Sequence, residues 1–156
     1  MPPLIQVWNA RYAKATALRV ARIEPQKLFV RLKGHIEPIR PFASPYFEAA
    51  QAIIVALDSG QDVNSELVLE MQGCQRYLEY KRSLFPEIDL PSQAAQFIAT
   101  VEYVRRRQRA ECLIHVRSPF SPRVIDGHHR VVTANALGIP VDVYVPLFWR
   151  KEAGTS

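Results

Sequence analysis

Apolar positions along the chain change from alternation to helical spacing and back to alternation. Near the start, apolar and basic residues alternate over 17–24 and 27–33, with Pro25 and Gln26 between the two runs. A period of two is typical of half-buried strands. We therefore predict a hairpin with one basic face here, preceded by a short strand over 4–8.

Helical spacing begins after a proline-marked loop. Residues 34–42 contain two prolines and predict an extended segment. Ser44 and Pro45 have the form of an N-cap followed by proline at the first helical position. The apolar stripe behind them predicts a helix to about Asp58.

Two further helices are predicted in the middle of the chain. The first begins at Asn64 or Ser65 and ends before Pro86, and the second starts after Ser92. The second finishes in basic residues, which favour a helix C-terminus and could also hold nucleic-acid phosphates. These are Arg105, Arg106, Arg107 and Arg109.

The last third returns to strand patterns. The patterns predict strands over 111–116 and 141–145. Between these strands, residues 123–138 predict a short strand, a tight turn at Asp126-Gly127 and a helix closed by Gly138.

Five polar or flexible residues stand at that turn, Asp126 to Arg130. A helix start offers unpaired N–H groups and a positive dipole end, and Gly127 lets an anion approach the backbone. Arg130 can contact phosphate oxygens in pairs, while His128 and His129 can donate hydrogen bonds or move a proton. We predict a phosphate site. The simpler alternative is a capped helix with solvated side chains.

A protein-bound metal is a second alternative. Neighbouring strands could bring His115 near Asp126, His128 and His129. Adjacent residues on a helix point in different directions and rarely chelate one ion together. We therefore expect Mg²⁺ bound to a nucleotide and no metal held by the protein alone.

The composition indicates the number of domains, the kind of partner and the cellular compartment to expect. The chain has 156 residues, 48% hydrophobic and 22% charged, which fits one globular domain. A net charge of +5 suggests polyanionic partners. Without an apolar run long enough for a membrane or a signal-like start, we expect a cytoplasmic protein that does not engage a membrane. Cys74 and Cys112 are expected to be buried thiols.

The last third of the chain has a recognisable order: a strand, a loop, a strand ending in Val-Ile-Asp-Gly-His-His-Arg, a helix ending in Leu-Gly, and a final strand Val-Asp-Val-Tyr-Val. This order resembles the ParB/sulfiredoxin superfamily. The similarity covers about 111–145 and, less closely, 36–60. It implies an α+β fold, a small mixed sheet with surrounding helices, as one domain over 1–156. Its core would be about 17–60 and 111–147, with a helical insertion over about 61–110.

Differences from the subfamilies narrow the activity that the resemblance implies. Sulfiredoxins have a catalytic cysteine where this chain has His128. Partition proteins have a Gly-Glu-Arg-Arg turn and a following helix-turn-helix domain, whereas 18 residues follow Gly138 here. We therefore expect neither sulfinic-acid reduction nor specific centromere recognition.

The resemblance leaves a nucleotide-binding ATPase, plausibly coupled to DNA binding or cleavage, as the leading hypothesis. The plasmid fertility-inhibition or oncogenic-suppression subgroup is the most compatible. Gly127, His128, His129 and Arg130 would hold the phosphates of ATP or another triphosphate with Mg²⁺. Glu37, Asp126 and His128 are the catalytic candidates.

Two alternatives stay open. One is a kinase of a free amino acid or other small molecule that uses Glu37 as its base, because the family's serine kinases place an acidic residue on a loop near the N-terminus. The other is a non-catalytic regulator that binds nucleotide or a protein partner. The arginines at the end of the third helix would contact DNA in the leading hypothesis, or form a solvated helix end.

Overall fold

The computed structural model describes residues 4–6, 16–115 and 122–146, which form an α+β fold. The strands are β1 (Leu4–Gln6), β2 (Thr16–Ile23), β3 (Phe29–Val30), β4 (Ala110–His115), β5 (Arg123–Asp126) and β6 (Val141–Pro146). The α-helices are α1 (Pro45–Asp58), α2 (Ser65–Glu70), α3 (Gln75–Leu84), α4 (Leu90–Arg107) and α5 (His128–Leu137). Short 3₁₀ turns are η2 (Pro25–Lys27), η3 (Pro41–Ala43) and η4 (Gln72–Cys74).

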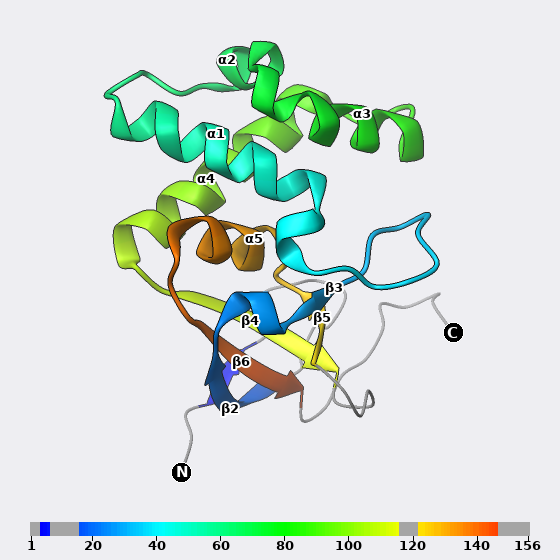
Figure 1. Cartoon of the computed structure of the whole chain (residues 1–156), viewed down its shortest axis with the longest axis vertical. Coiled ribbons are helices and arrows are strands. Elements are labelled where there is room, and N and C mark those ends of the chain that lie inside the picture. Colours follow the sequence, from blue (N-terminus) through cyan, green and yellow to red (C-terminus); the bar gives the residue numbers. More distant parts are fainter. Residues whose placement is uncertain (1–3, 7–15, 116–121, 147–156) are drawn as a thin grey trace.

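The strands form one mixed sheet in the order β1-β2-β6-β4-β5-β3. β6 is parallel to β4 and antiparallel to β2, and β5 is antiparallel to β4 and parallel to β3. The helices gather on one side of the sheet, with α5 next to it and α2 and α3 farthest away (Figure 1). The predicted mixed sheet with surrounding helices is confirmed.

The predicted hairpin over 17–24 and 27–33 is wrong. β2 pairs with β1 and β6, while β3 lies at the opposite edge beside β5. Between them, η2 carries the chain away from β2, and its Pro25 and the following Leu28 are buried. A buried 3₁₀ connection therefore stands where the alternation suggested a tight hairpin turn.

The first helix follows the prediction. Ser44 caps α1, and its hydroxyl accepts a hydrogen bond from the Tyr46 N–H at 3.1 Å. The helix ends at Asp58, as expected.

The second predicted helix is interrupted. The backbone leaves helical geometry at Met71 and continues through η4, so that the segment forms α2 and α3. Gly73 lies against α1 at this break, where an added Cβ would stand 2.7 Å from the Ala52 Cβ. The helix predicted after Ser92 begins three residues earlier, at Leu90, because Asp89 is its N-cap.

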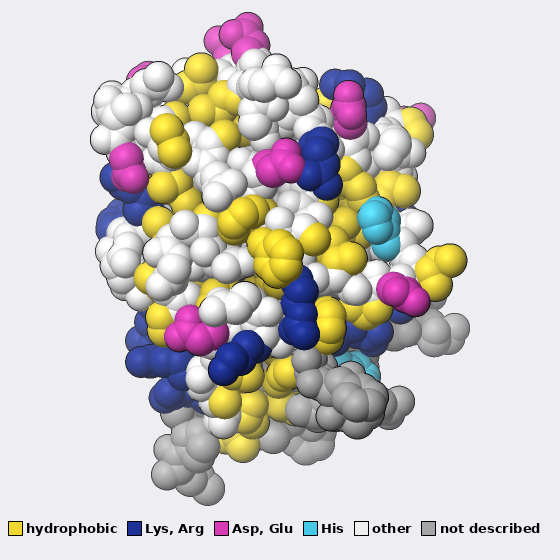
Figure 2. Space-filling model, in the orientation of Figure 1, with side chains coloured by type: hydrophobic (Ala, Val, Ile, Leu, Met, Phe, Trp, Pro, Cys, Tyr) yellow, Lys and Arg dark blue, Asp and Glu magenta, His cyan; other side chains and the backbone are white. Residues whose placement is uncertain are grey.

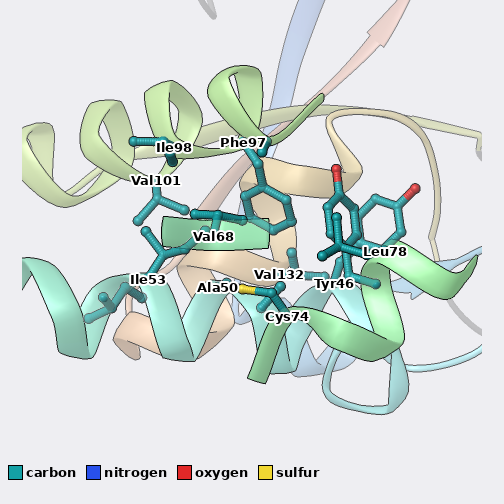
Figure 3. Close-up of a cluster of buried hydrophobic side chains, with 14 of the residues drawn as sticks. Tyr46, Ala50, Ile53, Val68, Cys74, Leu78, Phe97, Ile98, Val101 and Val132 are labelled. Atoms are coloured by element: carbon teal, nitrogen blue, oxygen red, sulfur yellow. The ribbon is translucent and has the colours of Figure 1, made fainter. Parts of the chain in front are cut away.

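Two hydrophobic cores meet at α5. One joins α1 to α4 and includes Val132, and the other lies between α5 and the sheet and includes Val131 and Ala134. Figure 3 shows side chains of the first core filling the space between α1, α4 and α5. Cys74 and Cys112 are free and buried, as predicted. None of the helices in the described residues has the length and apolarity that a membrane crossing requires.

Candidate functional site

Gly127 connects β5 to α5 in the predicted strand–turn–helix arrangement. Its φ is +103°, a left-handed value that side chains strain to adopt. It also lies against β4, where an added Cβ would stand 3.0 Å from the Cys112 Cβ and 3.1 Å from the Glu111 carbonyl oxygen. The glycine is therefore required by packing as well as by the turn.

The start of α5 borders a cavity of about 410 Å³. The Val131 N–H bonds to the Gly127 carbonyl at 2.9 Å. The N–H groups of the three preceding residues accordingly have no acceptor within the helix. The cavity is lined by Val30, Arg31, Thr100, Val124, Ile125, Asp126, Gly127, His128, His129 and Arg130. All five residues of the predicted site thus meet at one cavity.

Glu37 lies elsewhere. It is exposed in the loop between β3 and η3, which is closed at its base by paired backbone hydrogen bonds of 2.8 Å between Val30 and Ile39. Glu37 is not among the residues that line the cavity.

Two arginines supply positive charge at the cavity. Arg31 is exposed at its wall. The Arg130 Nη1 lies 3.7 Å from the Glu111 Oε2, and its guanidinium carbon lies 5.2 Å from the centre of the Tyr103 ring. β5 ends opposite Leu113, so Glu111, which pairs with Asp142 of β6, lies beyond the part of β4 that pairs with β5, and Arg130 reaches it there.

His128 is joined to α1. Its ring stacks on Tyr46 with 4.2 Å between centroids, and its Nε2 lies 3.1 Å from the Ser44 Oγ. Burial, with the Lys81 ammonium adding to it, lowers the pKa of His128 to about 3. The imidazole is therefore neutral near pH 7 and adds no charge to a phosphate site.

His129 packs in an aromatic cluster. Its ring centroid lies 4.7 Å from that of Tyr46, 4.8 Å from Phe97 and 6.3 Å from Tyr77. Burial, followed by the effects of His128 and Lys81, lowers its pKa well below 6.5. The cavity thus takes its positive charge from Arg31, Arg130 and the helix dipole, with both histidines neutral.

The alternative metal site does not form in the described residues. Within them, no group of three or more His, Cys, Asp or Glu side chains is arranged to hold an ion. His115, Asp126, His128 and His129 therefore do not make a joint ligand set there.

The predicted nucleic-acid arginines divide into two kinds. Arg105 bonds Asp58 at 2.9 Å and Arg109 bonds Asp142 at 3.1 Å, so both hold elements together. Arg106 and Arg107 are exposed at the end of α4, with Arg107 over the Tyr103 ring. Basic side chains on the face in Figure 2 are prominent over the sheet half of the molecule.

The role of Asp142 was not predicted from the sequence. Its side chain is 1% exposed and lies 2.9 Å from the Arg22 Nε, 3.1 Å from the Arg109 Nε and 3.5 Å from the Arg19 Nε. Burial raises the pKa of Asp142, but hydrogen bonds and charges from these arginines outweigh it and lower the pKa. An aspartate inside an apolar strand pattern was the available signal.

A second cavity, of about 840 Å³, was also missed. It is lined by Arg22, Ile23, Glu24, Gln26, Lys27, Arg40, Pro122 and Pro140. These residues come from four separate stretches of the chain and no motif joins them.

Comparisons of the chain with protein-family models, with curated proteins and with solved structures find no match. The resemblance to the ParB/sulfiredoxin superfamily accordingly stays a prediction. The residues around the two cavities are the structural evidence for function.

Proposed function

We propose that this protein binds a nucleoside triphosphate, with its phosphates in the cavity at the start of α5, and hydrolyses it. The observation that carries the proposal is the meeting of Arg31, Arg130 and the first-turn N–H groups of α5, which have no acceptor within the helix, at that cavity. Backbone N–H groups with arginine are typical phosphate ligands. The resemblance to the ParB/sulfiredoxin superfamily supports the same guest.

Asp126 is the carboxylate placed for chemistry, because it lines the cavity beside Gly127. Phosphoryl transfer needs positioning and charge neutralisation above all. Mg²⁺ carried by the triphosphate would supply further positive charge, and carboxylate oxygens suit it as ligands. In this proposal Asp126 holds the nucleotide-bound ion or orients the attacking water.

His128 serves this site by position. Its hydrogen bond to Ser44 and its stack on Tyr46 fix the first turn of α5 against α1. A base with a pKa of about 3 is a weak proton acceptor near pH 7. The arrangement therefore favours Asp126 over His128 for proton handling, and the exposed Glu37 lies outside the cavity lining.

DNA is the second part of the proposal. Arg106 and Arg107 place two exposed positive charges at the C-terminal end of α4, and the protein carries a net charge of +5. Binding through them would involve backbone phosphates, which gives affinity that falls steeply with salt.

Calorimetry with ATP and Mg²⁺, followed by phosphate release from labelled ATP, tests the nucleotide proposal. Arg130→Ala should weaken binding by about 1.5–3 kcal/mol, the range for a charged hydrogen bond. Asp126→Asn should keep binding and slow phosphate release by about 100-fold or more, as expected for loss of a catalytic carboxylate. Arg82→Ala and Asp62→Asn, at exposed positions, are the charge-matched controls.

The outcomes separate the alternatives. Binding without turnover indicates a regulator, and phosphoserine formed in the presence of free serine indicates a kinase. If calorimetry detects no nucleotide binding at all, both the proposed binding of the triphosphate and its proposed hydrolysis are excluded.

A further inference from the structure

The second cavity lies apart from the start of α5. It is bounded by the end of β2, by η2, by Arg40 before η3, and by Pro122 and Pro140, which precede β5 and β6. Its volume is about 840 Å³ and it shares no lining residue with the cavity at α5. A ligand here would be held by different side chains.

The charged residues of this cavity are mostly basic. Arg22, Lys27 and Arg40 line it together with a single carboxylate, Glu24, and the four other lining residues are uncharged. Such an excess of positive charge favours an anion carrying more than one charge.

Arg40 is held in place by stacking. Its guanidinium carbon lies 3.9 Å from the centre of the Phe29 ring. Its Nη1 is buried and has no hydrogen-bond partner in the described part of the chain. An unpaired buried donor is unfavourable, and an anion entering the cavity would offer this guanidinium an acceptor.

Arg22 is held by its pair with Asp142. The bond of 2.9 Å uses the Arg22 Nε, and its two Nη atoms have no hydrogen bond to other described residues. Asp142 is itself fixed by Arg19 and Arg109. The free edge of the Arg22 guanidinium is thus oriented before any ligand arrives, which lowers the entropic cost of binding.

Lys27 completes the set from η2. It is exposed and makes no ion pair with the described residues. Its mobile ammonium can follow a phosphate group that the two arginines hold.

We infer that this cavity is a second anion site, which binds a ligand carrying two or more linked phosphate groups. Two oriented guanidinium groups suit bidentate contacts with phosphate oxygens, and three cations exceed what one phosphate requires. The linked phosphates come from a polyphosphate-bearing small molecule or from a nucleic-acid backbone. The inference does not depend on nucleotide binding at α5.

Titration of the full chain with inorganic pyrophosphate by calorimetry, and with labelled oligothymidylate by fluorescence anisotropy, tests this inference. Lys27→Gln and Arg40→Gln should each weaken binding about tenfold, as expected for loss of a charge-assisted hydrogen bond. Arg82→Gln, which removes an exposed charge on α3, should change the affinity less than about twofold, the scale of a distant surface charge. Arg130→Gln tests the α5 cavity separately: it should weaken phosphate binding there without altering the losses that Lys27→Gln and Arg40→Gln cause.

The two probes distinguish the sources of phosphate. Losses confined to pyrophosphate indicate a small phosphorylated ligand, and losses confined to oligothymidylate indicate a nucleic-acid backbone. Unaltered affinity in Lys27→Gln and Arg40→Gln, or a loss seen only in Arg130→Gln, overturns the inference. If Arg40→Gln fails to fold by circular dichroism, Lys27→Gln decides, because its side chain is exposed and has no ion pair with described residues.

Discussion

Gly127 meets two requirements because it has no side chain: a left-handed backbone conformation and a close approach to β4. Its φ of +103° starts α5 in the left-handed region, and its α-carbon faces the β4 backbone with no room for a Cβ. Gly127 also lines the cavity next to the first N–H groups of α5. The turn and the packing against β4 therefore both require glycine at this position.

Gly127→Ala is expected to destabilise the fold by about 2–4 kcal/mol, because left-handed strain adds to the contacts with β4. Gly60→Ala is the matched control, since its φ is +80° and nothing lies within 4 Å of an added Cβ. Denaturant unfolding measures both free energies. Equal losses in the two variants would show that contact with β4 contributes nothing.

His128 and His129 predict a pH dependence of stability. The pKa of each is lowered in the folded state, that of His128 to about 3, so below about pH 6.5 the unfolded chain binds more protons than the folded one. Stability should therefore fall as pH decreases from 6.5, by up to about 1.4 kcal/mol per pH unit for each histidine.

Unfolding measured from pH 6.5 down to about pH 5 isolates this effect, because most carboxylates titrate lower. His129→Phe should give a shallower slope, while His35→Gln, in an exposed loop, should retain the full slope. A slope unaffected by His129→Phe would contradict the assignment.

Residue types at the site were predictable, and their surroundings were not. The order strand, Asp-Gly, helix placed Asp126 to Arg130 together in the sequence. Whether a histidine faces solvent or an aromatic cluster depends on α1, α3 and α4, which are distant in sequence. The pattern of one segment contains no information about those partners.

Between elements, α1 and the turn before α3 fit together through two small residues. Gly73 approaches so closely that an added Cβ would lie 2.7 Å from the Ala52 Cβ. Such an approach lets Cys74 and Tyr77 reach complete burial in the helical core.

Gly73→Ala should destabilise the protein by about 1–3 kcal/mol through overpacking. Ala52→Gly alone should cost about 1 kcal/mol in helix propensity. The double variant should be more stable than the sum of the single losses by at least about 0.5 kcal/mol, because the glycine makes room for the new methyl group. Additive losses in urea unfolding would exclude this contact as the reason for the break.

Helix ends were more predictable than helix continuity. Ser44 is the cap that its position suggested, and Asn64 caps α2 where a helix start was predicted, because capping is a local interaction. The interruption at Met71 has a cause on another helix, so apolar spacing over 65–84 suggested one uninterrupted element.

Across the whole molecule, Asp142 joins three parts of the chain. Arg19 and Arg22 come from β2, and Arg109 comes from the junction of α4 and β4. The buried carboxylate thereby connects the N-terminal strands to the end of the helical region, and it orients Arg22 toward the larger cavity.

Asp142→Asn should destabilise the fold by about 3–5 kcal/mol, because it leaves arginines around a buried site without a counter-charge. Asp58→Asn, which removes an exposed pair with Arg105, should cost less than about 1 kcal/mol. Thermal and urea unfolding would measure the difference. Similar small losses in both variants would show that the Asp142 cluster does not stabilise the fold.

The fold class was predictable from spacing, whereas the strand order was not. The alternation over 17–24 and 27–33 correctly identified segments that form strands, but it led to the wrong prediction that these two strands pair with each other. Their actual partners, β6 and β5, lie about one hundred residues later in the chain. Local pattern cannot rank such distant partners against an adjacent one.

The place of β6 also has a consequence for synthesis on the ribosome. β6 is the last described strand in the chain, yet it lies between β2 and β4 in the sheet. Until residues 141–146 emerge, the nascent chain can pair β1 with β2, and β4 with β5 and β3, but these two ribbons have no strand between them. Each ribbon then keeps an open edge. The helices from α1 to α4 are complete earlier, so the helical half can pack before β6 emerges, and the sheet closes only afterwards.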